Sequence, residues 1–174
     1  SSHVAPTPQG AGLAITGAVA LVWLAALAAS GQVSIRSLTF LLALAGATLL
    51  GFIDDTRPLP WGLKLAGQFV CAGIAVGALP PTWLADWSIG SGWAAWAFAA
   101  VALVALMNIV NFVDGIDGIT AAHSVPAFAV FGFAASIGAV SATAGLLAAA
   151  ACGAMVGFWL WNRHPARTFL GDAG

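Results

Sequence analysis

Residues Asn108 to Gly118 read NIVNFVDGIDG, and this stretch marks the end of a membrane-spanning helix. Its polar side chains fall three residues apart, at Asn108, Asn111, Asp114 and Asp117. At about 1.5 Å rise per residue they follow one broad face of a helix end, which two glycines then break. A carboxylate at a helix C-terminus faces the negative end of the helix dipole, so a purely structural Asp114 is disfavoured. Asp117 has an alternative role, as the cap of a helix that begins near Ile119.

The composition of the whole chain is that of an integral membrane protein. Of its 174 residues, 61% are hydrophobic and 6% are charged, whereas soluble domains average about 25% charged residues. A formal net charge of −1 argues against a nucleic-acid partner. Cys71 and Cys152 lie in apolar runs without metal-ligand spacing, which predicts ordinary helix packing.

Six apolar runs approach the ~20 residues that a membrane-spanning helix needs. They cover residues 13–29, 33–53, 62–79, 93–112, 119–139 and 142–161. The third run carries Lys64 and Gln68 in its first turns, where a long side chain can still reach the headgroups. We therefore expect an all-α, polytopic membrane helical bundle with about six transmembrane helices, forming a single integral-membrane domain over residues 1–174.

Basic residues orient this bundle in the bilayer. Those that follow even-numbered runs are Arg57, Lys64, Arg163 and Arg167, whereas Arg36 lies on the opposite side. The positive-inside rule places the larger group in the cytoplasm. The same face then receives five of the six acids, which are Asp54, Asp55, Asp114, Asp117 and Asp172, while Asp86 lies outside. We expect these five acids to converge on one site built from cytoplasmic loops.

Clustered carboxylates on glycine-containing turns suit a hard cation. Magnesium usually takes one or two carboxylates and fills its remaining positions with water and phosphate oxygens. Such a metal neutralises charge at the leaving oxygens, and the remaining catalytic work is in-line positioning. The acids therefore predict magnesium-dependent phosphate chemistry at the cytoplasmic surface.

Four segments together carry a resemblance to a known family. They are GFIDDTRPLPWGLKLAGQ at 51–68, NIVNFVDGIDGI at 108–119, GFWLWNRHPARTFLGDAG at 157–174 and HVAPTPQGAG at 3–12. In order, separation and shared membrane side they resemble signatures of the polyprenyl-phosphate N-acetylhexosamine-1-phosphate transferases, glycosyltransferase family 4, and most closely the type that initiates O-antigen or enterobacterial common antigen.

The resemblance implies an activity, a cofactor and a location. Such enzymes transfer an N-acetylhexosamine 1-phosphate from a UDP-sugar to undecaprenyl (polyprenyl) phosphate and release UMP. They require Mg2+ and lie in the bacterial inner membrane, with the active site facing the cytoplasm. The reaction is the first membrane step of a cell-envelope polysaccharide such as lipopolysaccharide. The resemblance leaves open whether the protein forms a homodimer.

The resemblance also implies roles for individual residues. Asp54 matches the candidate base near the lipid phosphate, and Asp55 and Asp117 match further catalytic positions. Asp172 matches the leading magnesium ligand, and Asn111 matches the second ligand, through its amide oxygen. The expected substrate-binding residues are Asn108, Asp114 and Lys64. Lys64 has an alternative reading as an anchor at the membrane interface.

The chain departs from the family pattern in several places. Gln9 and Ala11 stand where many relatives have a basic residue and a glycine, which leaves the phosphate contact of the first loop open. We expect a fragment that lacks the first and the last spans, together with a late His-rich loop. His3, His123 and His164 do not replace that loop, and His123 is expected to pack in a helix.

Other functions remain as alternatives. One is the phospho-MurNAc-pentapeptide transferase of peptidoglycan synthesis, which belongs to the same family. Another is a cation transporter, although transporters keep their sites near the membrane midplane. A CDP-alcohol phosphatidyltransferase ranks lower, because its Asp-Gly-x-x-Ala-Arg run is missing after Asp114.

Overall fold

The computed structural model describes residues 7–79 and 92–174, and in these ranges the regular structure is helical. The expected all-α fold is confirmed. The helices are α1 (Ala11–Ala29), α2 (Ile35–Thr56), α3 (Trp61–Gly77), α5 (Gly92–Val113), α6 (Ile119–Ser136) and α7 (Ala142–Asn162). Asp86, His3 and the first four residues of the 3–12 motif lie outside the described residues.

Two differences between the helices and the expected apolar runs matter for the site and for membrane spanning. Helix α2 continues to Thr56, so Asp54 and Asp55 lie in its last turn and not in the turn that follows it. The helix ends where Arg57 becomes extended, with φ −145° and ψ 97°, because the residue before a proline is driven out of the α region. Helix α3 has 17 residues, whereas the other five described helices are long and apolar enough to cross a membrane.

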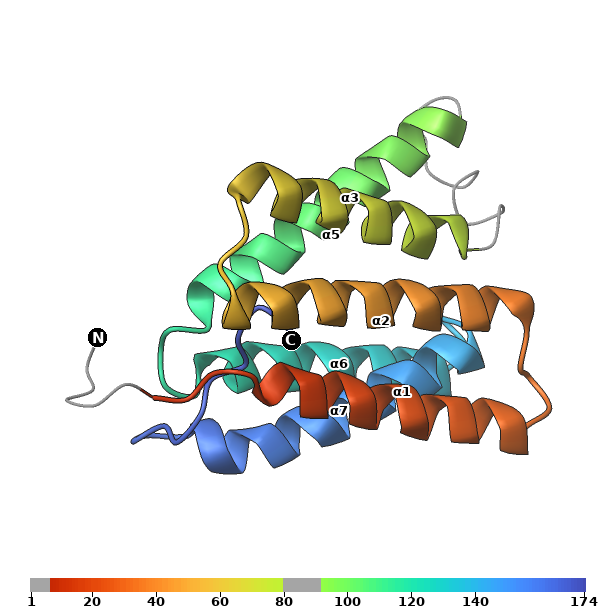
Figure 1. Ribbon diagram of the computed structural model, residues 1–174. Helices are drawn as coiled ribbons and strands as arrows, with labels where there is room; N and C mark the ends of the chain where they lie inside the picture. Colours follow the sequence, from red (N-terminus) through yellow and green to blue (C-terminus); the bar gives the residue numbers. More distant parts are fainter. Residues whose placement is uncertain (1–6, 80–91) are drawn as a thin grey trace.

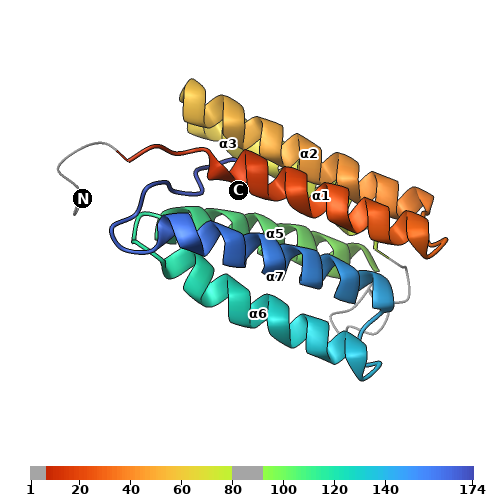
Figure 2. The same cartoon turned by 90° about the horizontal axis from the view of Figure 1, so that it is seen from below.

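Each described helix contacts its neighbour in the chain, and α7 returns to α1, so the contacts close a ring in chain order. Helix α7 packs on α6 and on α1, α1 touches α2, α2 packs on α3, and α3 packs on α5, while α5 and α6 touch least (Figures 1 and 2). Small residues permit the close contacts: Ala72, Ala99 and Ala100 form the core between α3 and α5. Large apolar side chains such as Leu21 (72% exposed) and Phe112 (89% exposed) face outward, as expected of helices surrounded by lipid.

The last residues of the chain return into the bundle beside its beginning. The amide of Phe169 donates to the carbonyl of Pro8 at 3.0 Å, and the amide of Gly12 donates to the carbonyl of Leu170 at 2.8 Å. Leu170 is buried in a cluster with residues of α6 and α7. The C-terminal segment 168–174 therefore lies among the helix ends (Figure 1).

Two glycines make room for this segment. A Cβ on Gly12 of α1 would overlap the backbone of Gly174, and a Cβ on Gly51 of α2 would overlap the carbonyl of Asp172. The segment can approach both helices because neither carries a side chain there. This approach brings Asp172 to the end of α2, where Asp54 and Asp55 lie.

Candidate functional site

Lys64 joins two of the predicted acids. Its Nζ lies 2.8 Å from Oδ2 of Asp54 and also contacts Oδ2 of Asp172. The amide of Leu59 donates to the other oxygen of Asp54 at 2.6 Å. The three charged side chains are between 13% and 21% exposed, so Lys64 points into the acid cluster and not out to the headgroups. The 51–68 and 157–174 motifs are therefore in contact, as expected.

Asp55 binds the backbone of the C-terminal segment. Its Oδ1 accepts from the amide of Asp172 at 2.9 Å, and its Oδ2 accepts from the amide of Ala173 at 3.2 Å. Both oxygens of the carboxylate are therefore used to hold the turn that carries Asp172. Asp55 is therefore placed to position Asp172 through the backbone of its turn.

Asp114 holds the same segment from the other side. It is 4% exposed, its Oδ2 accepts from the amide of Gly171 at 3.1 Å, and its Oδ1 accepts from the hydroxyl of Thr120 at 2.7 Å. Burial raises the pKa of Asp114, against the lowering effect of these two hydrogen bonds. Burial also raises the pKa of Asp172, partly offset by its contact with Lys64.

Asp117 lies in a separate group. Its Oδ2 contacts Nδ1 of His164 at 2.8 Å and accepts from the amide of Ala166 at 3.1 Å. The N-cap of α6 is Gly118, with φ 75°, so Asp117 lies one residue before the N-cap position. The carboxylate instead ties the α5–α6 turn to the loop after α7.

The two asparagines of the motif differ in their surroundings. Nδ2 of Asn108 donates to Oε1 of Gln68 at 2.8 Å and to the carbonyl of Val104 at 2.8 Å. Gln68 is buried and lies one helical turn beyond Lys64, so this pair extends the polar cluster into the bundle. Asn111 is half-buried and makes no side-chain hydrogen bond to any residue that the structure describes.

Sequence reasoning missed Asn162 as a member of the site. Its side chain is fully buried; Oδ1 accepts from the amide of Gly118 at 2.9 Å and Nδ2 donates to the carbonyl of Thr168 at 3.0 Å. The available signal was an amide at the end of an apolar helix, immediately before two basic residues. Thr120 was missed as well, because a threonine in a helical first turn carries no signal by itself.

The oxygen donors suit a hard cation, although they are not a ready-made metal cluster. Within residues 7–79 and 92–174, no three His, Cys, Asp or Glu side chains form a group that could hold a metal ion. Asp54 and Asp172 nevertheless already share one cation, the ammonium of Lys64. Asp172 offers a carboxylate, and Asn111 offers an amide oxygen that accepts no hydrogen bond from the described residues. Hard oxygen donors of this kind are those that magnesium uses, so the chemistry of these residues fits this ion.

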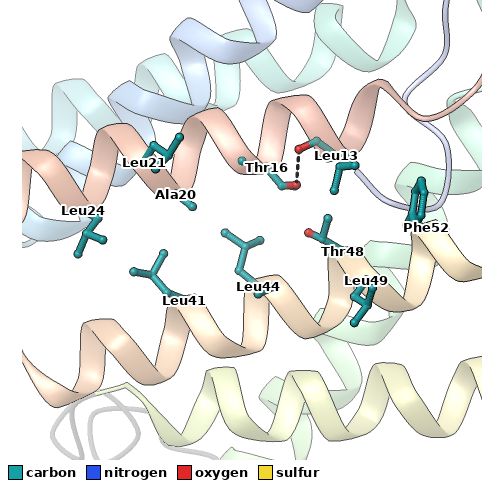
Figure 3. A pocket seen from close by; sticks show the side chains of 12 residues that line it. Leu13, Thr16, Ala20, Leu21, Leu24, Leu41, Leu44, Thr48, Leu49 and Phe52 are labelled. Carbon is teal, nitrogen blue, oxygen red and sulfur yellow. Dashed lines mark hydrogen bonds between the residues drawn. The ribbon is translucent and has the colours of Figure 1, made fainter.

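An apolar groove runs between α1 and α2 toward this cluster. Its volume is about 390 Å³, and Figure 3 shows side chains of both helices lining it from Leu24 and Leu41 to Leu13 and Phe52. Phe52 lies two residues before Asp54 on α2. The groove therefore ends within one helical turn of Asp54 along the axis of α2.

A second cavity lies between the groove and Asp172. It has a volume of about 190 Å³, shares Thr16, Leu44 and Thr48 with the groove, and is also lined by Asp172 and Gly174. The shared residues make the two spaces neighbours. The groove and the second cavity thus lie on the two sides of these shared side chains, and the second cavity reaches Asp172.

The helices and the polar cluster define a multi-pass membrane protein with a charged site at one end of its bundle. The model of glycosyl transferase family 4 matches residues 37–174, and the chain belongs to this family. Membership supports an activity of the polyprenyl-phosphate sugar-phosphate transferase type, with a sugar-phosphate donor and a polyprenyl phosphate acceptor in a membrane. A search of curated proteins found no match.

Proposed function

We propose that the protein transfers an N-acetylhexosamine 1-phosphate from a UDP-sugar to undecaprenyl phosphate in the bacterial inner membrane. The reaction releases UMP and begins a cell-envelope polysaccharide of the O-antigen or enterobacterial common antigen kind. The observation that carries this proposal is the meeting of Asp54, Lys64 and Asp172 beside an apolar cavity that shares lining residues with the groove between α1 and α2. A lipid with a phosphate headgroup needs an apolar site for its hydrocarbon chain next to a charged site for its phosphate.

The acceptor's hydrocarbon chain lies in the groove between α1 and α2 in this proposal. From Leu13 to Leu24 the groove follows α1 for about 16 Å at 1.5 Å per residue. Its lining is almost entirely apolar, and exposed leucines at its rim, such as Leu21 and Leu49, face the surrounding lipid. The acceptor can therefore enter sideways from the bilayer with its hydrocarbon chain in the groove, and its phosphate then lies toward the end of α2 that carries Asp54.

The charged residues then act on the two phosphates. Lys64 neutralises charge on the acceptor phosphate, and Asp54 accepts its remaining proton. Little deprotonation is needed, because the second ionisation of a phosphate monoester lies near pH 6. The acceptor oxygen attacks the sugar-linked phosphorus, and the bond to UMP breaks. Asn108, the expected substrate-binding residue, precedes Asp114 in the sequence, and Asp117, the expected catalytic residue, follows it; both contribute to the side of the site that receives the nucleotide.

Magnesium fits the oxygen donors of Asp172, with Asn111 as the second proposed ligand, and would supply charge neutralisation at the phosphate oxygens. Asp55 and Asp114 act through Asp172, since both bind the backbone of its turn. Cytoplasmic exposure of this end follows from the basic residues that accompany it.

The test is isotope exchange with the protein reconstituted in vesicles. We expect labelled UMP to enter UDP-N-acetylglucosamine or a related UDP-N-acetylhexosamine only when undecaprenyl phosphate and Mg2+ are both present. Asp172→Asn should abolish the exchange, because a charged oxygen donor becomes neutral. Exchange confined to UDP-MurNAc-pentapeptide would favour the peptidoglycan alternative, and cation flux without exchange would favour a transporter.

A further inference from the structure

A basic pocket follows the end of α7, apart from the residues that the proposed reaction uses. Its volume is about 230 Å³, and it is lined by Leu160, Trp161, Arg163, His164, Pro165 and Arg167. Three of these six side chains are basic, and all three are exposed. The pocket opens at the end of the bundle that carries the acids.

Both guanidinium groups of the pocket lie over indole rings. The guanidinium carbon of Arg163 is 5.8 Å from the ring centroid of Trp159, and that of Arg167 is 5.9 Å from the centroid of Trp161. The amide of Arg167 also donates to the carbonyl of Trp161 at 2.8 Å, which folds the loop back onto the helix end. The contacts with the indoles hold two otherwise flexible side chains near one cavity.

The tryptophans place this cavity at the level of the lipid headgroups. Tryptophan prefers the boundary between hydrocarbon and water, and Trp159, Leu160 and Trp161 are 43%, 56% and 57% exposed. An apolar surface therefore adjoins the guanidiniums on the membrane side. A ligand that carries both a phosphate and hydrocarbon chains matches this arrangement.

The positive charges of Arg163 and Arg167 are not paired with carboxylates of the described residues. Across the described ranges, the acid that contacts the loop is Asp117, whose Oδ2 binds His164 and the amide of Ala166. Two arginines without acidic partners at a membrane surface favour an anion, and a guanidinium can offer two parallel N–H donors to phosphate oxygens.

We propose that this pocket binds the phosphate of an anionic phospholipid headgroup, with Arg163 and Arg167 as its ligands and Leu160 and Trp161 beside the acyl chains. The site is distinct from the acceptor groove, which lies between α1 and α2. It also adjoins the reaction site, because His164 and Ala166 hold Asp117. A bound lipid thus fixes the loop that ties the α5–α6 turn to α7.

Native mass spectrometry of the purified protein in detergent tests this site, with phosphatidylglycerol as the anionic probe and phosphatidylcholine as the zwitterionic probe. The double variant Arg163→Gln/Arg167→Gln should bind phosphatidylglycerol about thirtyfold more weakly, at roughly fivefold for each basic side chain near the membrane surface. Arg57→Gln, which removes one charge from the same end of the bundle outside the pocket, should leave the affinity unchanged. Thermal unfolding of each variant checks that it is folded.

A parallel titration with UDP-N-acetylglucosamine distinguishes the source of the phosphate. Unchanged nucleotide affinity in the double variant, together with weaker phosphatidylglycerol binding, supports the lipid site. The proposal is overturned if phosphatidylglycerol binds the double variant as well as the wild type, or if the nucleotide affinity falls while the lipid affinity does not. Since neither readout requires turnover, failure of the proposed reaction would leave this test intact.

Discussion

Asp55 holds Asp172 by its backbone: Oδ1 of Asp55 accepts from the amide of Asp172 at 2.9 Å, and Oδ2 accepts from the next amide. The neighbouring residue Asp54 meets the side chain of the same aspartate through Lys64. Adjacent carboxylates in one helical turn thus have different tasks. One sets the position of the C-terminal turn, and the other faces the charges that would meet a phosphate.

The first prediction separates these two tasks. Asp55→Asn replaces one acceptor oxygen with an amide and leaves a backbone N–H unpaired, at a cost of about 1–3 kcal/mol. Amide hydrogen exchange at Asp172 and Ala173 should therefore accelerate by about tenfold to a hundredfold. Asp54→Asn should lower turnover without changing this exchange. If the amides of Asp172 and Ala173 exchanged equally slowly in both variants, Asp55 would not hold the C-terminal segment.

The second prediction concerns the space that Gly51 leaves for the C-terminal segment. Gly51→Ala should destabilise the protein by about 1–3 kcal/mol, as overpacking does, because the new Cβ overlaps the Asp172 carbonyl. Gly153→Ala on α7 is the matched control, since nothing lies within 4 Å of its Cβ. There alanine should stabilise the helix slightly. Thermal unfolding in detergent measures both, and a Gly51→Ala variant as stable as the control would contradict the close approach.

The third prediction is a pH dependence of stability. Because burial raises the pKa of Asp114, its stabilising contribution is complete below the pKa of the unfolded chain, about 3.9, and is lost as pH rises through the folded value. Asp114→Asn removes this loss and can keep both contacts, with its amide donating to Thr120 and its oxygen accepting from Gly171.

The Tm of the wild type, relative to that of Asp114→Asn, should thus fall as the pH rises above about 4. The raised pKa of Asp172 acts in the same direction in both proteins, so the difference isolates Asp114. Parallel Tm curves for the two proteins would mean that Asp114 titrates normally.

The fourth prediction tests the groove between α1 and α2. Ala20→Phe places a ring in the groove, so the KM for undecaprenyl phosphate should rise about tenfold while the KM for the UDP-sugar stays the same. Ala127→Phe makes the same change on an exposed position of α6, away from the groove, and should leave both values unchanged. Steady-state kinetics of UMP release provides the measurement. A rise in both constants for Ala20→Phe would point to misfolding.

The fifth prediction concerns membrane sidedness. Thr56, Ile116 and Pro165 are exposed at the end of the bundle that carries the acids, and Gly31 is exposed at the opposite end. After Cys71 and Cys152 are replaced by alanine, single cysteines at the first three positions should react with a membrane-impermeant thiol reagent only in inside-out vesicles. A cysteine at Gly31 should react only in right-side-out vesicles. Any mixed pattern among the first three would separate the acids between the two faces.

The sequence by itself determined the class of fold and the side on which the acids gather. Apolar runs of membrane-spanning length are a local property, and residues 108–118 show where one such run ends in polar chemistry. The alternation of helices then places every second connection on one face. This alternation predicts that Asp54, Asp55, Asp114 and Asp172 lie near one another.

Only the tertiary structure decided which group each side chain binds. Lys64 and Asp172 are 108 positions apart, and Asp55 binds a backbone amide 117 positions away; hydropathy and spacing carry no information about such pairs. The buried partners Gln68 and Asn162 emerged for the same reason, because a buried amide must find a hydrogen-bond partner wherever packing brings one. The C-terminal segment folds back between Gly12 and Gly51, where the absence of side chains lets the backbones approach closely. This fold-back decides which acids position the segment and which face the proposed substrates.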